Sequence, residues 1–505
     1  MKIKRMTAPA LALLLAFGLA ACAGPGTADK EGAPANEKSP AVIDDGGEAA
    51  ENTTEKTKIL PDLPVMDFEG FEFKIITSDY KADGNMAQEI GAEEENGDPV
   101  NDAVYKRNKT IEEKYNVVIK EILHDRDTLN APVKKAVAAA DGSYDLVCGN
   151  IRELGILAQG GSLIDLAGVR YLGLDKPWYD QKAANDLSIG NKLFFAVGEL
   201  QISDNNGTWA VLFNKKLFAD LGLSDPYGLV REGDWTIDKF FEFAASACRD
   251  LDGDGKMTEE DRWGTLGEGF NIYALMNGSG TRFIQKDEND LPFYAGYTSR
   301  DIDIFDKCAS YLGDKDRSML AENYSGKYSN VWFDLINPIF ATDRILFFFT
   351  SLSRVTWHRS SETDFGILPT PKYEKSQDAY LNTVSVWMAS GMGMPATLGG
   401  ADLDRTAVIA EALSAESMYT LTPAYYGVQL KTKLARDDES GEMLDMIFAS
   451  RTYSLAQLYD WGGLLSTVQG QLTASSRNFV SSMDKIEAKV TSAIEKTIAA
   501  FETAG

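Results

Sequence analysis

The sequence predicts an α/β fold, and three observations support this prediction. Short apolar segments typical of strands alternate with segments whose apolar residues recur every three or four positions, as on one face of a helix. The 505 residues are 44% hydrophobic and 25% charged, which is a globular composition and a length that suggests two or more domains. No repeat of fixed period occurs, so a repeat architecture is not expected.

The first α/β unit is expected between residues 71 and 150. Apolar or alternating segments predict three strands, at residues 71–77 (FEFKIIT), 116–122 (NVVIKEI) and 144–149 (YDLVCG). The helix between the first two strands is predicted by a stripe of apolar side chains, which are Val100, Val104, Ile111 and Tyr115. A second helix is predicted at residues 133–140. Because strands that alternate with helices usually pair in parallel, this region predicts a parallel sheet.

The same alternation continues through the rest of the chain. Strands are predicted at residues 192–200 (KLFFAVGEL), 208–214 (TWAVLFN) and 345–350 (ILFFFT), and helices at 214–223 and 236–250, the latter with Thr236 as its N-cap. From residue 401 onward the pattern is mostly helical. The last helix keeps one apolar side, made of Phe479, Met483, Ile486, Val490, Ile494 and Phe501.

The N-terminus has the layout of a bacterial export signal. A positive start with Lys2, Lys4 and Arg5 precedes an apolar stretch at residues 8–21, which is short for a membrane span. The stretch ends in LAAC, which resembles a lipobox and predicts that Cys22 is lipidated after residues 1–21 are removed. An ordinary cleaved signal peptide is the alternative. Residues 23–62 have almost no aromatic side chains and predict a flexible tether.

Net charge and missing motifs exclude several classes of function. The formal net charge of -26 argues against binding nucleic acid, or anionic lipid through a basic patch. The chain has no phosphate-binding loop, no nucleophile elbow and only two histidines, so a His-based zinc site or an acyl-transfer triad is not expected. A glycosidase needs only two carboxylates facing a sugar, and 76 acidic residues leave that possibility open.

The segment Arg249–Gly264 (RDLDGDGKMTEEDRWG) has the spacing of a calcium loop. Calcium loops supply oxygen ligands at positions 1, 3, 5, 7 and 12 and need a glycine at position 6, which here is Gly255. The predicted ligands are Asp250, Asp252, Asp254, the Lys256 carbonyl and Asp261. Position 12 is Asp rather than the usual Glu, and the loop is solitary. A structural calcium ion is therefore expected, which raises stability and is not itself the ligand.

Six stretches in order resemble the substrate-binding lipoproteins of bacterial ABC importers, in the carbohydrate-type family related to maltose- and alginate-binding proteins. They are residues 104–117, 142–150, 211–223, 234–255, 364–373 and 415–428. The resemblance implies a two-lobe, periplasmic-binding-protein-like fold with hinge crossings and a helix-rich second lobe. The first lobe would comprise residues 63–204 plus 382–422, and the second 205–381 plus 423–505. The crossings would lie near residues 203–207, 380–390 and 421–426.

The resemblance also implies a function without catalysis. The protein would be anchored by lipid on the outer face of the bacterial cytoplasmic membrane. There it would capture a solute, in this family usually a sugar or oligosaccharide, and deliver it to the membrane subunits of an importer by hinge closure. A secreted lipoprotein glycosidase and a calcium-dependent cell-surface adhesion module are the alternatives. The α/β alternation and the single calcium-like loop argue against the adhesion module.

Nine residues are candidates for ligand contact. Ligands of α/β proteins bind beyond the carboxyl ends of parallel strands, which nominates Ser78, Tyr80 and Asn150. The polar run SDNNGTW at an expected crossing nominates Asp204, Asn205 and Trp209, although the same residues also suit a plain turn. Position within the family nominates Asn271 and Tyr273, and Trp387 lies in another expected crossing. Replacing Trp209 by Ala is expected to weaken binding and leave the fold intact.

Overall fold

The computed structural model describes residues 58–80, 88–358, 361–427, 438–474 and 477–503. Residues from Ile59 onward form one compact unit, distinct from the unit that ends at Lys58. Cys22 and the predicted tether up to residue 57 lie outside the described residues. None of the helices in the described part is both long and apolar enough to cross a membrane.

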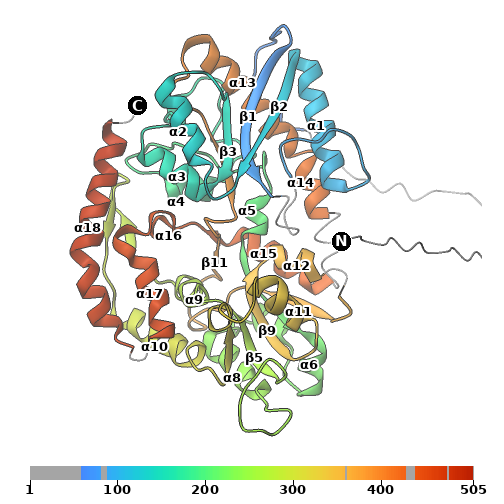
Figure 1. Cartoon of the computed structure of the whole chain (residues 1–505), viewed down its shortest axis with the longest axis vertical. Coiled ribbons are helices and arrows are strands. Elements are labelled where there is room, and N and C mark those ends of the chain that lie inside the picture. Colours follow the sequence, from blue (N-terminus) through green and yellow to red (C-terminus); the bar gives the residue numbers. More distant parts are fainter. Residues whose placement is uncertain (1–57, 81–87, 359–360, 428–437, 475–476, 504–505) are drawn as a thin grey trace, which may run out of the picture. The chain divides into compact units, whose positions relative to one another are not determined.

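The first sheet has four strands in the order β12-β3-β1-β2 (Figure 1). Its strands are β1 (Phe71–Asp79), β2 (Val117–Asp125), β3 (Leu146–Asn150) and β12 (Ser390–Gly393). β1 pairs in parallel with β2 and β3, so the three-strand parallel unit predicted from the sequence is confirmed. β12 comes from far along the chain and adds an antiparallel edge to β3.

Helices cover this sheet and begin at recognisable caps. α1 (Pro99–Tyr115) starts at Asp98, whose carboxylate accepts hydrogen bonds from the N–H groups of Val100 and Asn101, and it packs on α13 (Gly400–Ser417). α3 (Ile151–Gln159) packs against β3 and β12, with α2 (Asn130–Ala139) beside it. One hydrophobic cluster joins Phe73 and Ile75 of β1 to Val408 and Leu413 of α13.

The second sheet is mixed, with the order β10-β4-β9-β5-β8. Its strands are β4 (Trp209–Asn214), β5 (Trp263–Gly267), β8 (Ser318–Leu320), β9 (Ile345–Ser351) and β10 (Phe365–Leu368). All seven residues of β9 are buried, as its continuous apolar sequence predicts. β5 is parallel to β8 and β9, whereas β4 is antiparallel to β9 and β10. α8 (Ile237–Ala247) packs on this sheet, and Thr236 caps it as predicted.

A short parallel pair lies beside the second sheet. β11 (Asn382–Thr383) pairs with β13 (Arg451–Thr452), and a single bridge joins Thr208 to Val384. A separate hairpin pairs β6 (Ile284–Lys286) with β7 (Pro292–Tyr294). The predicted division of the chain into lobes stays a prediction.

The strand predicted at residues 192–200 is wrong. Residues 193–197 are buried, as their hydrophobicity suggests, but the segment makes only isolated bridges. Ala196 exchanges two backbone hydrogen bonds with Met392 of β12. Among the described residues, no further pair extends this bridge into a ladder on either side of Ala196.

The C-terminal helix α18 (Phe479–Thr503) contacts elements near both large sheets. It contacts α3, which packs on the first sheet, and it also contacts β7 and α17. Near its end, the ring of Phe501 lies 4.7 Å from that of Phe194, and Gln159 donates a hydrogen bond of 2.8 Å to Thr497. The predicted apolar side is confirmed, with Ile486 only partly buried. Figure 1 shows α18 (red) along one side of the molecule, beside α16 and α17.

The remaining helices connect these elements. The α-helices are α4 (Gln181–Leu187), α5 (Ser203–Asn206), α6 (Lys215–Asp220), α7 (Pro226–Arg231), α9 (Asn271–Gly278), α10 (Ser299–Leu312), α11 (Asn337–Phe340), α12 (Ser353–His358), α14 (Leu421–Pro423), α15 (Asp438–Ala449), α16 (Leu455–Tyr459) and α17 (Leu464–Thr473). The 3-10 helices are η1 (Leu166–Gly168), η2 (Ala321–Asn323) and η5 (Trp461–Gly463), and η3 (Trp332–Ile336) is a π-helix.

Candidate functional site

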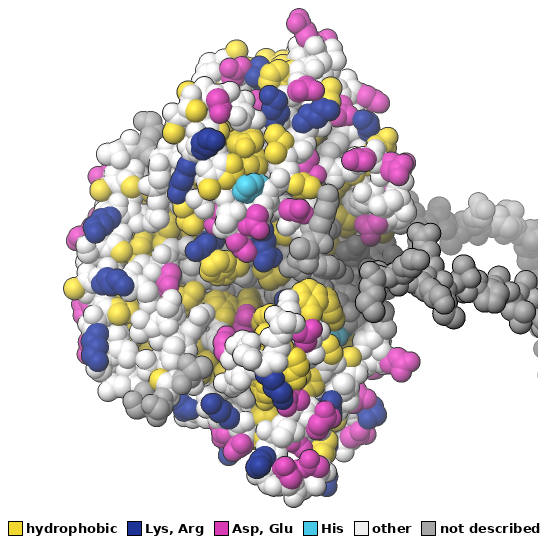
Figure 2. All heavy atoms as spheres, in the orientation of Figure 1, with side chains coloured by type: hydrophobic (Ala, Val, Ile, Leu, Met, Phe, Trp, Pro, Cys, Tyr) yellow, Lys and Arg dark blue, Asp and Glu magenta, His cyan; other side chains and the backbone are white. Residues whose placement is uncertain are grey.

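A cleft of about 620 Å³ lies where strand ends of both large sheets meet. β1 and β2 of the first sheet end on it at Asp79 and Asp125, β9 of the second sheet ends on it at Ser351, and Glu268 follows β5 directly. Figure 2 shows a hollow across the middle of one face of the molecule, bordered by both hydrophobic and charged side chains. The cleft therefore lies at the edges where ligands of open α/β sheets bind.

Aromatic side chains form much of the apolar lining. Trp209 at the start of β4 packs against Phe270, with ring centroids 4.9 Å apart. Trp332 and Phe333 come from the π-helix η3, and Trp387 comes from the segment that leads to β12. Phe333 and Trp387 are 38% and 44% exposed, so both offer ring surface to a ligand.

Acidic side chains outnumber basic ones along the lining. The carboxylates are Asp79, Asp125, Asp127, Glu268 and Glu322, and the guanidiniums are Arg126 and Arg354. Arg126 lies 3.4 Å from the Asp127 carboxylate, and the Arg354 guanidinium lies 5.0 Å from the centroid of the Trp332 ring. Both arginines thus already have partners within the cleft wall.

Glu268 is the most perturbed carboxyl group of the cleft. Burial and the charge of Glu322 raise its pKa to about 7, against the charge of Arg354. Its backbone N–H donates to the Asn271 side chain at 2.5 Å, and the adjacent Gly269 N–H donates to Glu322 at 2.8 Å. The second of these hydrogen bonds holds the Glu322 carboxyl group beside the backbone that follows Glu268.

Two buried polar groups of the lining have no hydrogen-bond partner among the described residues. They are the indole Nε1 of Trp209 and the side-chain amide of Gln457 on α16. The two residues are only 4% and 3% exposed. Since buried polar groups normally have partners, both groups are suited to bind polar atoms of a ligand.

The structure brings two of the nine predicted ligand residues, Trp209 and Trp387, to the cleft. The Arg152 guanidinium covers one face of the Trp387 ring at 4.0 Å from its centroid. Trp209 is largely a core residue, since its ring also packs on Phe349. Ala at position 209 would empty a well-packed core position, so we expect this change to lower the stability of the fold as well as the affinity.

Three other predicted residues lie behind the cleft wall. Ser78 is fully buried, and the Tyr80 hydroxyl lies 2.7 Å from the hydroxyl oxygen of Ser390 on β12. Asn150 caps α3, and its amide donates to the backbone carbonyl of Arg126 at 3.0 Å. Asn150 thereby holds the backbone of a residue that does line the cleft.

The remaining four predicted ligand residues make internal contacts away from the lining. Asp204 and Asn205 belong to the short helix α5 and both accept hydrogen bonds from Arg451, at 2.5 and 2.9 Å. Asn271 donates to the Phe349 carbonyl at 2.8 Å, and it also accepts the Glu268 N–H. Tyr273 shares a hydrogen bond of 2.7 Å with Ser454.

Sequence reasoning missed most of the lining, and one signal could have found part of it. Asp125 ends an apolar strand, and Glu268 follows another. The rule that nominated Ser78 and Asn150 applies equally to these two positions. Trp332 and Phe333 carry no such signal, because they reach the cleft through the π-helix and the packing around it.

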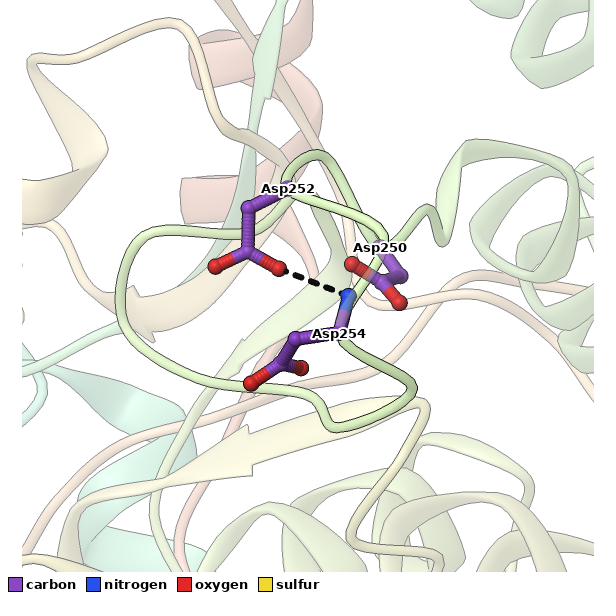
Figure 3. A group of neighbouring side chains, drawn as sticks. All are labelled: Asp250, Asp252 and Asp254. Carbon is purple, nitrogen blue, oxygen red and sulfur yellow. Dashed lines mark hydrogen bonds between the residues drawn. The ribbon is translucent and has the colours of Figure 1, made fainter.

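The loop between α8 and β5 holds the predicted calcium ligands (Figure 3). Carboxylate oxygens of Asp250, Asp252 and Asp254 lie within 4.8 Å of one another. N–H groups of Gly253 and Gly255 donate to Asp250 at 2.7 and 2.8 Å, which lowers the pKa of its carboxyl group. Both glycines have positive φ angles, of 76° and 81°. Three closely spaced oxygen donors fit a hard cation such as Ca²⁺.

Asp261 plays a different part in this loop. One of its oxygens accepts the Leu251 N–H at 2.8 Å, and the other accepts the Thr258 N–H at 2.7 Å. Asp261 is fully buried and is not among the three carboxylates that cluster. Its hydrogen bonds tie the two ends of the loop together.

Comparison with known proteins gives a result only at the level of structure. No protein-family model matches the chain, and no curated protein matches its sequence. The maltose-binding periplasmic protein of Listeria monocytogenes in complex with maltose is 13% identical, with a TM-score of 0.56 over 84% of this chain and 98% of that one.

Two further solved structures are similar over nearly their whole length. A cyclo/maltodextrin-binding protein complexed with maltotetraose is 13% identical, with a TM-score of 0.54 over 86% of this chain and 98% of that one. An ABC substrate-binding protein of Listeria monocytogenes in complex with cycloalternan is 12% identical, with a TM-score of 0.52 and the same coverage. The chain therefore has the periplasmic-binding-protein-like fold of these proteins, which confirms the fold predicted from the sequence.

Proposed function

We propose that the protein is an extracytoplasmic solute-binding protein that captures a sugar or oligosaccharide and presents it to the membrane subunits of an ABC importer. The fold it shares with sugar-binding ABC substrate-binding proteins supports this proposal. The main support for this proposal is the cleft between the two large sheets, because the lining of the cleft matches the chemistry of a sugar.

A sugar has apolar ring faces and a rim of hydroxyl groups. The exposed rings of Trp387 and Phe333 suit the ring faces. The unpartnered Trp209 Nε1 and Gln457 amide suit the hydroxyl groups, as do the carboxylates. A volume of about 620 Å³ lies in the range of small-molecule sites and is large enough for more than one sugar ring.

Capture would work by hinge closure. Lining residues follow strands of the first sheet at Asp79 and Asp125, and strands of the second sheet at Ser351 and Glu268. A ligand that contacts both sets binds the closed form more tightly than the open form and therefore populates it. The importer would recognise this closed form. Lipid on Cys22 would hold the protein at the outer face of the cytoplasmic membrane.

We further propose that the loop from Asp250 to Asp261 binds a structural calcium ion. Asp250, Asp252 and Asp254 would supply carboxylate oxygens and Lys256 its carbonyl, as the spacing predicts. Asp261, which the sequence also nominated, would keep the loop closed through its backbone hydrogen bonds. The ion would neutralise the three carboxylates that follow the end of α8.

Isothermal titration calorimetry against a panel of mono- and oligosaccharides tests the main proposal. Trp387→Ala removes a 44% exposed ring from the cleft and is expected to weaken binding about tenfold. Phe293→Ala is the matched control, because Phe293 on β7 is 43% exposed and lies outside the cleft. Equal affinities of the two variants, or no saturable binding of any sugar, would contradict the proposal.

Product analysis after long incubation separates binding from hydrolysis. Glu268 and Glu322 form a carboxyl pair in the cleft, and one of them has a raised pKa, which are features that glycosidases also use. A binding protein returns the oligosaccharide unchanged. Release of shorter sugars that Glu268→Gln abolishes would establish a glycosidase instead.

A further inference from the structure

We propose that the ligand is a sugar bearing a protonated amine, whose ammonium group is held by the carboxyl groups of Glu268 and Glu322. This inference rests on the proposed function and narrows it to one chemical class of ligand. It depends on the charge of the cleft and on the hydrogen-bonding groups of its lining.

The charge of the cleft favours a cation. The two strand ends of the first sheet contribute Asp79, Asp125 and Asp127, and the opposite wall contributes Glu268 and Glu322. Both guanidiniums of the lining are already engaged, as described above. Carboxylates outnumber the guanidiniums of the lining by five to two, so closing the cleft concentrates excess negative charge, and a bound ammonium group reduces that repulsion.

Glu268 is placed to receive the ammonium group. Its carboxyl group makes no hydrogen bond with any described residue, whereas Glu322 accepts one from the Gly269 N–H. Burial and the charge of Glu322 raise the pKa of Glu268 to about 7. A bound cation would favour the ionised form of this carboxyl group.

The rest of the cleft indicates that the cation belongs to a sugar. Trp209 Nε1 and the Gln457 amide are buried without partners, at 4% and 3% exposure. A metal ion or a simple alkylamine bound at Glu268 leaves both of these groups unsatisfied. A ligand that carries hydroxyl groups as well as an ammonium group satisfies all three positions.

Three tetrasaccharides with the same β-1,4 backbone test the inference by calorimetry at neutral pH. They carry a hydroxyl, an acetamido or a free amino group at carbon 2, and spermidine serves as an amine without a sugar. The amino form is expected to bind at least about tenfold more tightly than the acetamido form, since charge-assisted hydrogen bonds are about twice as strong as neutral ones. Glu268→Gln is expected to weaken the binding of the amino form more than that of the other two forms, and so to erase that preference.

Glu495→Gln is the matched control, because Glu495 is exposed on α18 and its loss changes the net charge equally. Three results would overturn the inference. The first is that the amino form binds no more tightly than the other forms, the second is that Glu268→Gln weakens the binding of all forms equally, and the third is that spermidine binds tightly. The inference is also overturned if none of the three tetrasaccharides binds. The proposed function is tested separately, by the binding of the wider panel of sugars.

Discussion

Arg451 donates a hydrogen bond of 2.5 Å to the buried carboxylate of Asp204 and so joins β13 to the short helix α5. Its other terminal nitrogen lies 2.9 Å from Asp180, and the side chains of all three residues are at most 16% exposed. Burial raises the pKa of Asp204, and the charge of Arg451 opposes the rise. The polar run that suggested a ligand site is thus part of an internal ion-pair network.

Replacing Arg451 by Met is expected to lower the free energy of unfolding by about 3–5 kcal/mol, because it leaves two buried carboxylates without their partner. Arg317→Met is the control, because Arg317 pairs with Asp314 at an exposed site. This change should lower the free energy of unfolding by less than about 1 kcal/mol. Urea unfolding measures both. A loss for Arg451→Met no larger than that of the control would show that the network contributes little to stability.

Trp209 should be tested with a change that keeps its ring packing. Trp209→Phe preserves an aromatic ring against Phe270 and Phe349 but removes the buried Nε1 donor. Ligand affinity is expected to fall about three- to tenfold, which corresponds to one hydrogen bond. Trp209→Ala is expected to lower the stability by about 3–5 kcal/mol as well. Unchanged affinity in Trp209→Phe, measured by calorimetry, would remove the indole N–H from the binding site.

The sequence predicted the fold well where a local pattern was decisive. The periodicity of β1, α1, β2 and α18 and the cap at Thr236 follow from which residues are apolar and which accept hydrogen bonds. The segment at residues 192–200 has the same apolar character as a strand but makes only isolated bridges, such as that between Ala196 and Met392. Strand pairing is a property of the whole sheet, so a single segment cannot predict it.

The candidate site was predicted less completely for a related reason. Trp209 and Asp204 come from the same short run of sequence, yet one lines the cleft and the other is paired with Arg451. The partner of Asp204 lies 247 residues away, and no feature of the run indicates it. Glu268 was within reach of the strand-end rule, whereas Trp332 depends on a π-helix that has no recognised sequence pattern.

Calcium is expected to raise the melting temperature by several degrees. A ligand present at about 100 times its Kd stabilises the folded state by about 2.7 kcal/mol. Asp252→Asn combined with Asp254→Asn should abolish the shift, whereas Asp316→Asn in an exposed turn should retain it. Differential scanning calorimetry with calcium and with a chelator measures these changes. No shift in the unmodified protein would refute the site, and loss of sugar binding on chelation would contradict a purely structural role.

Stability is expected to fall as the pH rises through about 8, and Glu89 is one identified cause. Burial and the charge of Asp204 raise the pKa of this carboxyl group from 4.5 to about 8, against the charge of Arg107. The pKa of Glu89 is higher in the folded state than in the unfolded state, so protonated Glu89 stabilises the fold. This contribution is complete below about pH 4.5 and is lost as the pH rises through 8. The loss is about 1.4 kcal/mol for each pH unit between these two values. Glu89→Gln should therefore show a shallower decline in melting temperature between about pH 4.5 and 8, and should melt higher than the unmodified protein above pH 8. Thermal melts between about pH 4 and pH 9 measure the effect. The control Glu495→Gln should follow the unmodified protein. Parallel curves for both variants and the unmodified protein would show that Glu89 does not cause the pH dependence.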